Sequence, residues 1–129
     1  MSGYYVDLQT ATEENDNFRK VLFTAPHSQL VVMTLKGGED IGSERHPNLD
    51  QFICVASGRA RAVLDGDQYI LDPGSAVVVP AGTEHNIINS SPTESLRLFT
   101  VYSPPAHPDG TINHTKKDAV AYERQHNES

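Results

Sequence analysis

Short runs of β-forming residues separated by turn signals are the feature that most constrains the fold of this chain. From Arg19 onward, runs rich in apolar and β-branched side chains alternate with turns that contain Gly or Pro. Asp65-Gly66, between two such runs, is a type I′ hairpin signal. No helical period of ten residues separates the runs, so the pattern disfavours βαβ units and predicts an antiparallel sandwich or barrel. The predicted strands are Lys20–Thr24, Leu30–Leu35, Gln51–Ala56, Ala60–Leu64, Gln68–Leu71, Ala76–Val79, His85–Asn89 and Leu96–Tyr102.

The two ends of the chain differ in character from the strand-rich part. Residues 1–18 are polar and acidic, and we expect an N-terminal arm that is loose or docks on another surface. Residues 19–103 carry the predicted barrel. Residues 104–129 begin with a Pro-rich crossing loop and end in a short helix, for which Thr115 and Asp118 have capping-box spacing. This is the one helix that the pattern predicts.

The composition excludes several classes of partner. The 129 residues are enough for one domain, and their net charge of −7 disfavours binding to the phosphates of nucleic acid. The chain has neither a basic amphipathic face nor an apolar run long enough to span a bilayer, so we expect no membrane partner. Its single cysteine, Cys54, allows no internal disulfide, and the N-terminus lacks the pattern of a signal peptide. These features predict a cytoplasmic protein.

Four polar residues between positions 44 and 85 could meet inside the barrel. Glu44 and His46 are two apart, so an extended backbone points both to one face. Gln51 follows a Pro-Asn turn, which can change which face of the backbone the next side chains occupy. His85 is the first residue of a separate predicted strand. Two imidazoles, a carboxylate and an amide oxygen are plausible ligands for a divalent transition metal. A lone buried histidine is more often a hydrogen-bonded structural residue, but four unpaired polar groups would be costly to bury together.

The spacing of residues 38–58 resembles the first conserved motif of the cupin superfamily. That motif runs Gly, five residues, His, one residue, His, three or four residues, Glu, six residues, Gly. The chain fills this frame with Gly38, Glu44, His46, Gln51 and Gly58. It departs from the pattern twice, because Glu44 stands at the first histidine and Gln51 stands at the glutamate.

Residues 74–89 resemble the second cupin motif, which runs Gly, five residues, Pro, one residue, Gly, two residues, His, three residues, Asn. Every position is filled, by Gly74, Pro80, Gly82, His85 and Asn89. The resemblance is to small single-domain bacterial cupins. It implies an all-β fold, an antiparallel double-stranded β-helix or jelly-roll barrel, in which Asn89 has a structural role.

The resemblance also implies a metal held by Glu44, His46, Gln51 and His85. Glu44 supplies the carboxylate that Gln51 lacks, so the charge of the usual ligand set is kept. The set is richer in oxygen than three histidines, which favours Mn, Fe, Co, Ni or Zn over Cu. Many cupins have lost their metal, and a metal-free scaffold is therefore the alternative interpretation.

Two classes of function fit these features. The first is a metalloenzyme of dioxygenase, isomerase or lyase type that acts on a small polar organic molecule; the second is a non-catalytic module that binds a metal or small ligand. Tyr102, His107 and His114 are candidates for catalytic residues, since a histidine over a barrel mouth can transfer protons. An ordinary exposed loop histidine is the alternative. By resemblance we also expect a homodimer in which the N-terminal arm is exchanged.

Overall fold

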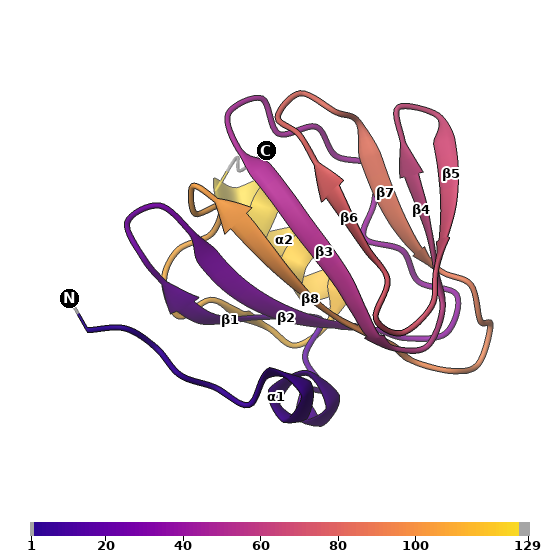
Figure 1. Cartoon of the computed structure of the whole chain (residues 1–129), viewed down its shortest axis with the longest axis horizontal. Coiled ribbons are helices and arrows are strands. Elements are labelled where there is room, and N and C mark those ends of the chain that lie inside the picture. The colour runs from indigo at the N-terminus through magenta and orange to yellow at the C-terminus, as the bar shows by residue number, and fades with distance from the viewer. Residues whose placement is uncertain (1, 127–129) are drawn as a thin grey trace.

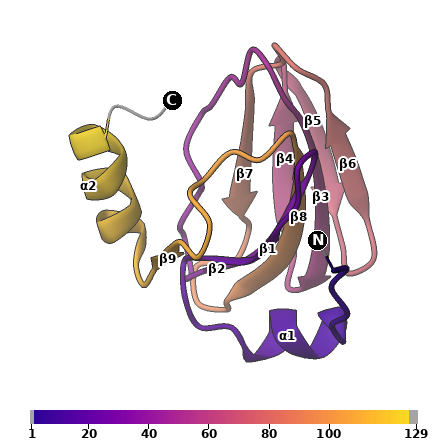
Figure 2. The ribbon, with the colours of Figure 1, turned by 90° about the vertical axis from the view of Figure 1, so that its left-hand side faces the viewer.

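Two antiparallel β-sheets dominate the computed structural model, which describes residues 2–126 (Figure 1). In chain order the strands are β1 (Arg19–Thr24), β2 (Gln29–Leu35), β3 (Asp50–Ser57), β4 (Ala60–Leu64), β5 (Asp67–Leu71), β6 (Ala76–Val79), β7 (His85–Asn89), β8 (Leu96–Ser103) and β9 (Ile112–Asn113). The larger sheet has the order β6-β3-β8-β2-β1-β9, and the smaller has the order β5-β4-β7. Figure 2 shows the two sheets from the side, facing each other. The predicted jelly-roll architecture is confirmed.

The local signals located the strands well. All eight predicted strands are present, with ends that differ by at most one residue from the prediction. The turn between β4 and β5 has φ angles of 46° at Asp65 and 89° at Gly66, as a type I′ hairpin requires. Strand β9 was not predicted, because its two residues carry no pattern of their own. It forms by pairing with β1 at the edge of the larger sheet.

The expectation that the chain has one helix, near its C-terminus, was wrong. A second helix, α1 (Leu8–Glu14), lies in the N-terminal arm, with the Asp7 carboxylate accepting a hydrogen bond from the Thr10 amide. It packs against β2, β3 and β8 and buries Thr12 completely. Seven residues without an apolar stripe are too short to be helical alone, so tertiary contacts stabilise α1. The arm therefore docks on its own barrel.

The predicted C-terminal helix is confirmed as α2 (Lys116–His126). The Thr115 hydroxyl accepts a hydrogen bond from the Asp118 amide at 3.0 Å, as the capping signal predicts. Ala119 is buried, and the Lys116 amine lies 2.5 Å from the Asp40 carboxylate. Figure 2 shows α2 standing to one side of the sheets. Within residues 2–126, neither helix has the length and apolarity needed to cross a bilayer.

The inward face of the larger sheet changes from apolar to polar along its length. At one end Leu35 on β2 pairs with Leu96 on β8, and both side chains are fully buried. At the other end Tyr102 on β8 pairs with Gln29 on β2 and with Gln51 on β3, and all three are buried. The first end is ordinary apolar core. The second end holds buried polar groups that need partners, and there the fold positions the candidate site.

Candidate metal centre

Backbone pairing brings the candidate ligands together. Glu44 forms an isolated antiparallel bridge with His85, in which each amide donates to the other residue's carbonyl at 2.8 Å. Residues that pair directly across a bridge present their side chains on the same face. His46 lies two residues further along, on that same face, and its carbonyl accepts a hydrogen bond from the Gly82 amide at 2.8 Å. The segment before β3 is thereby fixed against β7 and the turn that precedes it.

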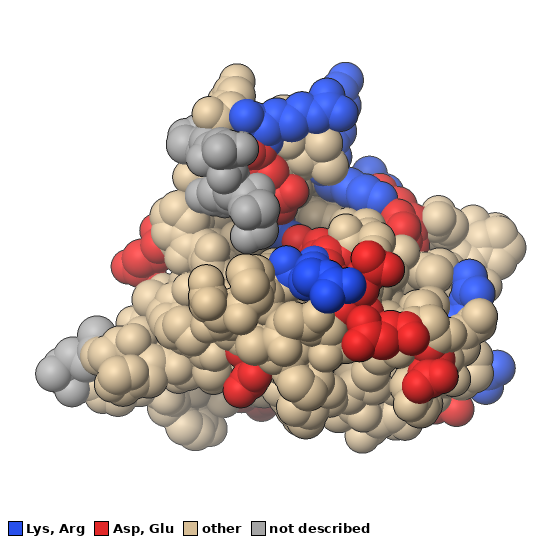
Figure 3. Space-filling view, turned by 90° about the horizontal axis from the view of Figure 1, so that it is seen from above, with Lys and Arg blue, Asp and Glu red and all other residues tan. Residues whose placement is uncertain are grey.

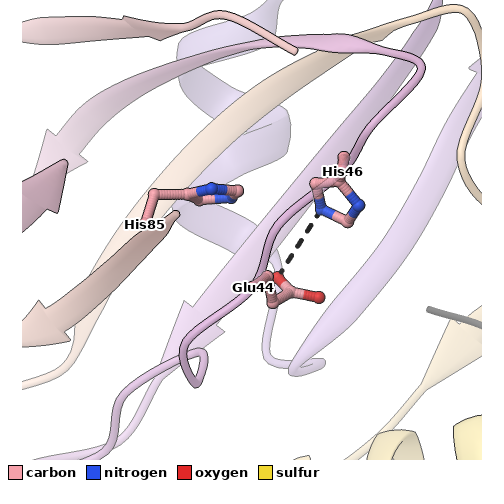
Figure 4. A group of neighbouring side chains, drawn as sticks. All are labelled: Glu44, His46 and His85. Atoms are coloured by element: carbon pink, nitrogen blue, oxygen red, sulfur yellow. Dashed lines mark ion pairs between the residues drawn. The ribbon is translucent and has the colours of Figure 1, made fainter. Parts of the chain in front are cut away.

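The three side chains converge closely enough to share one ion. Figure 4 shows Glu44 and His46 projecting from one segment and His85 reaching toward them from β7. One ligand atom from each residue lies within 4.8 Å of the others, and the rings of His46 and His85 are 5.4 Å apart between centroids. Adjacent ligands on one ion are about 3.0–3.4 Å apart, since each bond is about 2.1 Å. The most widely separated ligand atoms would therefore have to approach each other by up to about 1.8 Å to share one ion.

Unpartnered polar atoms show that the donor set fits a cation. Nε2 of His46, Nε2 of His85 and Oε1 of Gln51 are all buried without a hydrogen-bond partner. Nδ1 of His85 donates to the Thr83 carbonyl at 2.9 Å, which leaves a lone pair on Nε2. A buried lone pair with no donor is costly, and a divalent metal held by the three converging side chains would satisfy the two imidazole nitrogens.

Gln51, the fourth predicted ligand, lies on a neighbouring strand of the larger sheet. It lies on β3 with 3% of its surface exposed, next to Tyr102 and Val79 on the neighbouring strands. Its amide nitrogen donates to the Thr100 hydroxyl at 3.0 Å, and this bond sets which end of the amide is the free acceptor. The role of Gln51 as a fourth ligand stays a prediction. Thr100, which orients it, was not singled out in the sequence because a strand threonine carries no distinctive signal.

Burial perturbs the protonation of the ligands in opposite directions. Burial raises the pKa of Glu44 to about 7, against the opposing charge of Arg19, and the negative charge of Glu123 contributes to the rise. Burial, followed by the charges of His85 and Arg19, lowers the pKa of His46. His46 is therefore held neutral with its lone pair available, while the Glu44 carboxyl ionises near neutral pH. A bound cation would favour the ionised form of Glu44.

Of the three candidate catalytic residues, Tyr102 lies beside the candidate ligand His46, and His107 lies beside Tyr102. The Tyr102 ring meets the His46 ring edge-on at 6.2 Å and the His107 ring at 5.1 Å. Burial raises the pKa of Tyr102 to about 12, and burial with the charges of Arg19 and His46 lowers the pKa of His107 to about 3. Tyr102 therefore stays protonated and His107 stays neutral at physiological pH.

The loop that carries His107 is held over the barrel by Gln29. The Gln29 amide nitrogen donates to the His107 carbonyl at 2.8 Å, and its amide oxygen accepts from the His107 backbone N–H at 3.0 Å. Nε2 of His107 is buried without a partner. His114, in contrast, is exposed and contacts the Asn17 side chain through Nδ1 at 2.7 Å. Among the contacts of the described residues, none joins His114 to the candidate ligands.

Sequence reasoning missed Arg19, a charged residue inside the barrel. Arg19 is 3% exposed, and it points inward from β1 in alternation with Val21. The predicted first strand began at Lys20, so Arg19 fell outside the alternation. Side chains alternate between the two faces of a strand, so extending the alternation backward from Val21 would have placed Arg19 on the inner face.

Comparisons with known proteins agree with the fold and the motifs. The family model described as "Cupin domain" matches residues 31–102. YrkC of Bacillus subtilis is 45% identical over 127 residues, which cover 93% of this chain and 67% of YrkC. L612 of Acanthamoeba polyphaga mimivirus is 45% identical over 113 residues, which cover 85% of this chain and 71% of L612. The crystal structure of BH2720 from Bacillus halodurans has a TM-score of 0.90 at 37% identity, covering 93% of this chain and 95% of that one. The chain belongs to the cupin family.

Proposed function

We propose that this protein binds one divalent transition metal through Glu44, His46, His85 and Gln51 and acts with it on a small polar organic molecule. The observation that carries the proposal is the convergence of the His46 and His85 imidazoles, each with a buried and unpartnered Nε2, on the Glu44 carboxylate. The donor set of two nitrogens and two oxygens favours Mn, Fe, Co, Ni or Zn. The reaction class that we propose is that of a dioxygenase, isomerase or lyase.

The side chains around the ligands suit the handling of a polar substrate. A bound divalent ion would supply a Lewis acid that polarises a substrate oxygen. Tyr102, protonated because it is buried, can donate a hydrogen bond to a negative oxygen. His107, neutral for the same reason, has an unpartnered Nε2 that can accept a proton or a hydrogen bond. These two residues are the proposed catalytic pair.

Metal content is the first test. We expect about one equivalent of metal in protein purified without added metal or chelator, measured by plasma mass spectrometry. His46→Ala and His85→Ala should each lose it, whereas the control His27→Ala, at an exposed turn residue, should keep it. Absence of metal from the wild type, even after metal is added, would overturn the proposal. Retention of metal by both site variants would do the same.

Water access to the ion separates an enzyme from a non-catalytic binding module. We expect Mn(II)-loaded protein to enhance the relaxation of water protons, because a catalytic site keeps an open coordination position. A small oxygen ligand should reduce this enhancement. If the loaded protein shows no enhancement, the site is closed, and the protein is a storage or binding module.

The proposal keeps the remaining expectations from the sequence. The protein would be a cytoplasmic homodimer that acts on a small molecule and has no nucleic-acid or membrane partner. The resemblance to small cupins supports the dimer. A solution mass near 14 kDa by light scattering at micromolar concentration would contradict it.

A further inference from the structure

Arg19 is a buried cation with incomplete pairing. Its Nη1 lies 3.3 Å from a carboxylate oxygen of Glu123 and 3.5 Å from the side-chain oxygen of Asn113. Its Nε is buried and has no hydrogen-bond partner. A guanidinium carries five N–H donors, and burying such a charge without full compensation is costly. Arg19 Cζ also lies over the Phe18 ring, 5.4 Å from its centroid, and these contacts leave Nε as a buried donor without a partner.

The guanidinium faces the same interior as the metal ligands. It is hydrogen-bonded to the Tyr102 hydroxyl. The Tyr102 ring meets the His46 ring edge-on at 6.2 Å, so Arg19 lies one side chain away from His46.

Glu123 is the more exposed partner of this ion pair. Its side chain is 32% exposed, whereas that of Arg19 is 3% exposed. It belongs to α2, which lies to one side of the two sheets in Figure 2 and packs on the core through Ala119. Helix α2 thus presents a carboxylate to the buried arginine, 3.3 Å from its Nη1.

The surface of the molecule would not attract an anion. The net charge is −7, and on the face seen in Figure 3 acidic and basic side chains are interspersed. Selectivity for an anion would therefore come from a local buried cation, which is the role that Arg19 is placed to fill.

We propose that Arg19 is the anion-binding residue of the metal site, that the small organic ligand carries a carboxylate, and that Glu123 occupies the place of this carboxylate in the ligand-free protein. The proposal rests on the function proposed above. It commits to a carboxylate rather than a phosphate because the group already paired with Arg19 is a carboxylate. Binding would exchange one charge-assisted hydrogen bond for another and release the Glu123 side chain to solvent.

Glycolate and its neutral amide, glycolamide, are suitable probes, with affinity measured by calorimetry on protein loaded with Zn(II). We expect glycolate to bind more tightly than glycolamide. Arg19→Met should weaken glycolate roughly 10- to 100-fold, because it removes a charge-assisted hydrogen bond. Glu123→Gln should tighten glycolate about two- to fivefold, because it removes the charge of a partly exposed competitor. Neither substitution should change the affinity for glycolamide by a comparable factor.

Control variants separate a binding role from a structural one. Arg59→Met removes an arginine from an exposed ion pair with Asp72 and should leave glycolate affinity unchanged. If Arg19→Met fails to fold, Arg19→Lys replaces it. Lysine keeps the positive charge but lacks the planar set of guanidinium N–H donors, so we expect glycolate affinity between those of the wild type and Arg19→Met. Glu123→Gln tests the competition independently of either variant.

The outcomes distinguish the two proposals. Failure of the wild type to bind Zn(II) would refute the proposed function. Normal Zn(II) binding combined with equal glycolate affinity in wild type and Arg19→Met would refute only the role of Arg19. Wild-type protein that binds no glycolate, or that prefers inorganic phosphate, would overturn the assignment to carboxylates. No tightening in Glu123→Gln would show that the Arg19–Glu123 pair merely anchors α2.

Discussion

Replacing Glu44 with glutamine tests how burial tunes the proposed metal site. The carboxyl pKa of Glu44 is raised to about 7 by burial, from an ordinary value of 4.5. At pH 6 the wild-type side chain therefore carries about 0.9 proton, and at pH 8 it carries about 0.1. A metal binds the ionised form and displaces that proton. The affinity of the wild type for metal should consequently be about tenfold weaker at pH 6 than at pH 8 through Glu44 alone.

The assay is calorimetric titration of metal-free protein with Zn(II) in two buffers that differ in ionisation enthalpy. The number of protons released follows from the difference in heat. We expect the wild type to release about 0.9 more protons than Glu44→Gln at pH 6, and about 0.1 more at pH 8. The other ligands are common to both proteins, so the difference isolates Glu44. Glu94→Gln, which removes an exposed carboxylate, should match the wild type.

The same substitution has a consequence for stability in the absence of metal. Because the folded-state pKa of Glu44 lies above its unfolded value, the folded protein loses stability as pH rises from about 4.5 to about 7. The loss is roughly 3 kcal/mol at most, and less in practice because the Glu44 side chain is 26% exposed. Metal-free Glu44→Gln should therefore unfold at higher urea than the wild type at pH 8. In the calorimetric titration, equal proton release by the wild type and Glu44→Gln on binding Zn(II) at pH 6 would refute the raised pKa of Glu44.

Three further predictions concern backbone, core and acid stability. Gly58→Ala should cost roughly 2–4 kcal/mol in urea unfolding, because the new Cβ would lie 2.8 Å from the Ser95 carbonyl oxygen. Gly74→Ala is the control, because Gly74 has a similar positive φ but open space around it, and it should cost about 1 kcal/mol. If both substitutions cost the same, the contact with the Ser95 carbonyl does not destabilise Gly58→Ala. Asn89→Ala should cost roughly 2–4 kcal/mol, since the buried amide donates to three carbonyls; a loss under 0.5 kcal/mol would contradict its structural role. His107, whose pKa is lowered to about 3, stabilises the fold less as pH falls below 6.5, so His107→Gln should resist acid unfolding better than wild type.

The strands and the ligand frame could be predicted because their signals are local. Alternating apolar residues bounded by Gly and Pro define each strand within a few residues, and Asp65-Gly66 admits one hairpin geometry. Glu44 and His46 share a face because strand periodicity is two. His85 was associated with them through motif spacing, and the bridge between Glu44 and His85 supplies the physical reason for it.

Other features depend on contacts between residues far apart in the chain. Helix α1 forms because β2, β3 and β8 offer it a surface, and β9 forms because β1 offers an edge. The amide oxygen of Gln51 is left as a free acceptor because Thr100, 49 residues away, holds the amide nitrogen. The raised pKa of Glu44 and the pairing of Arg19 with Glu123, 104 residues apart, follow from burial and from the placement of α2. Burial and charge proximity are properties of the packed chain, and no local pattern encodes them.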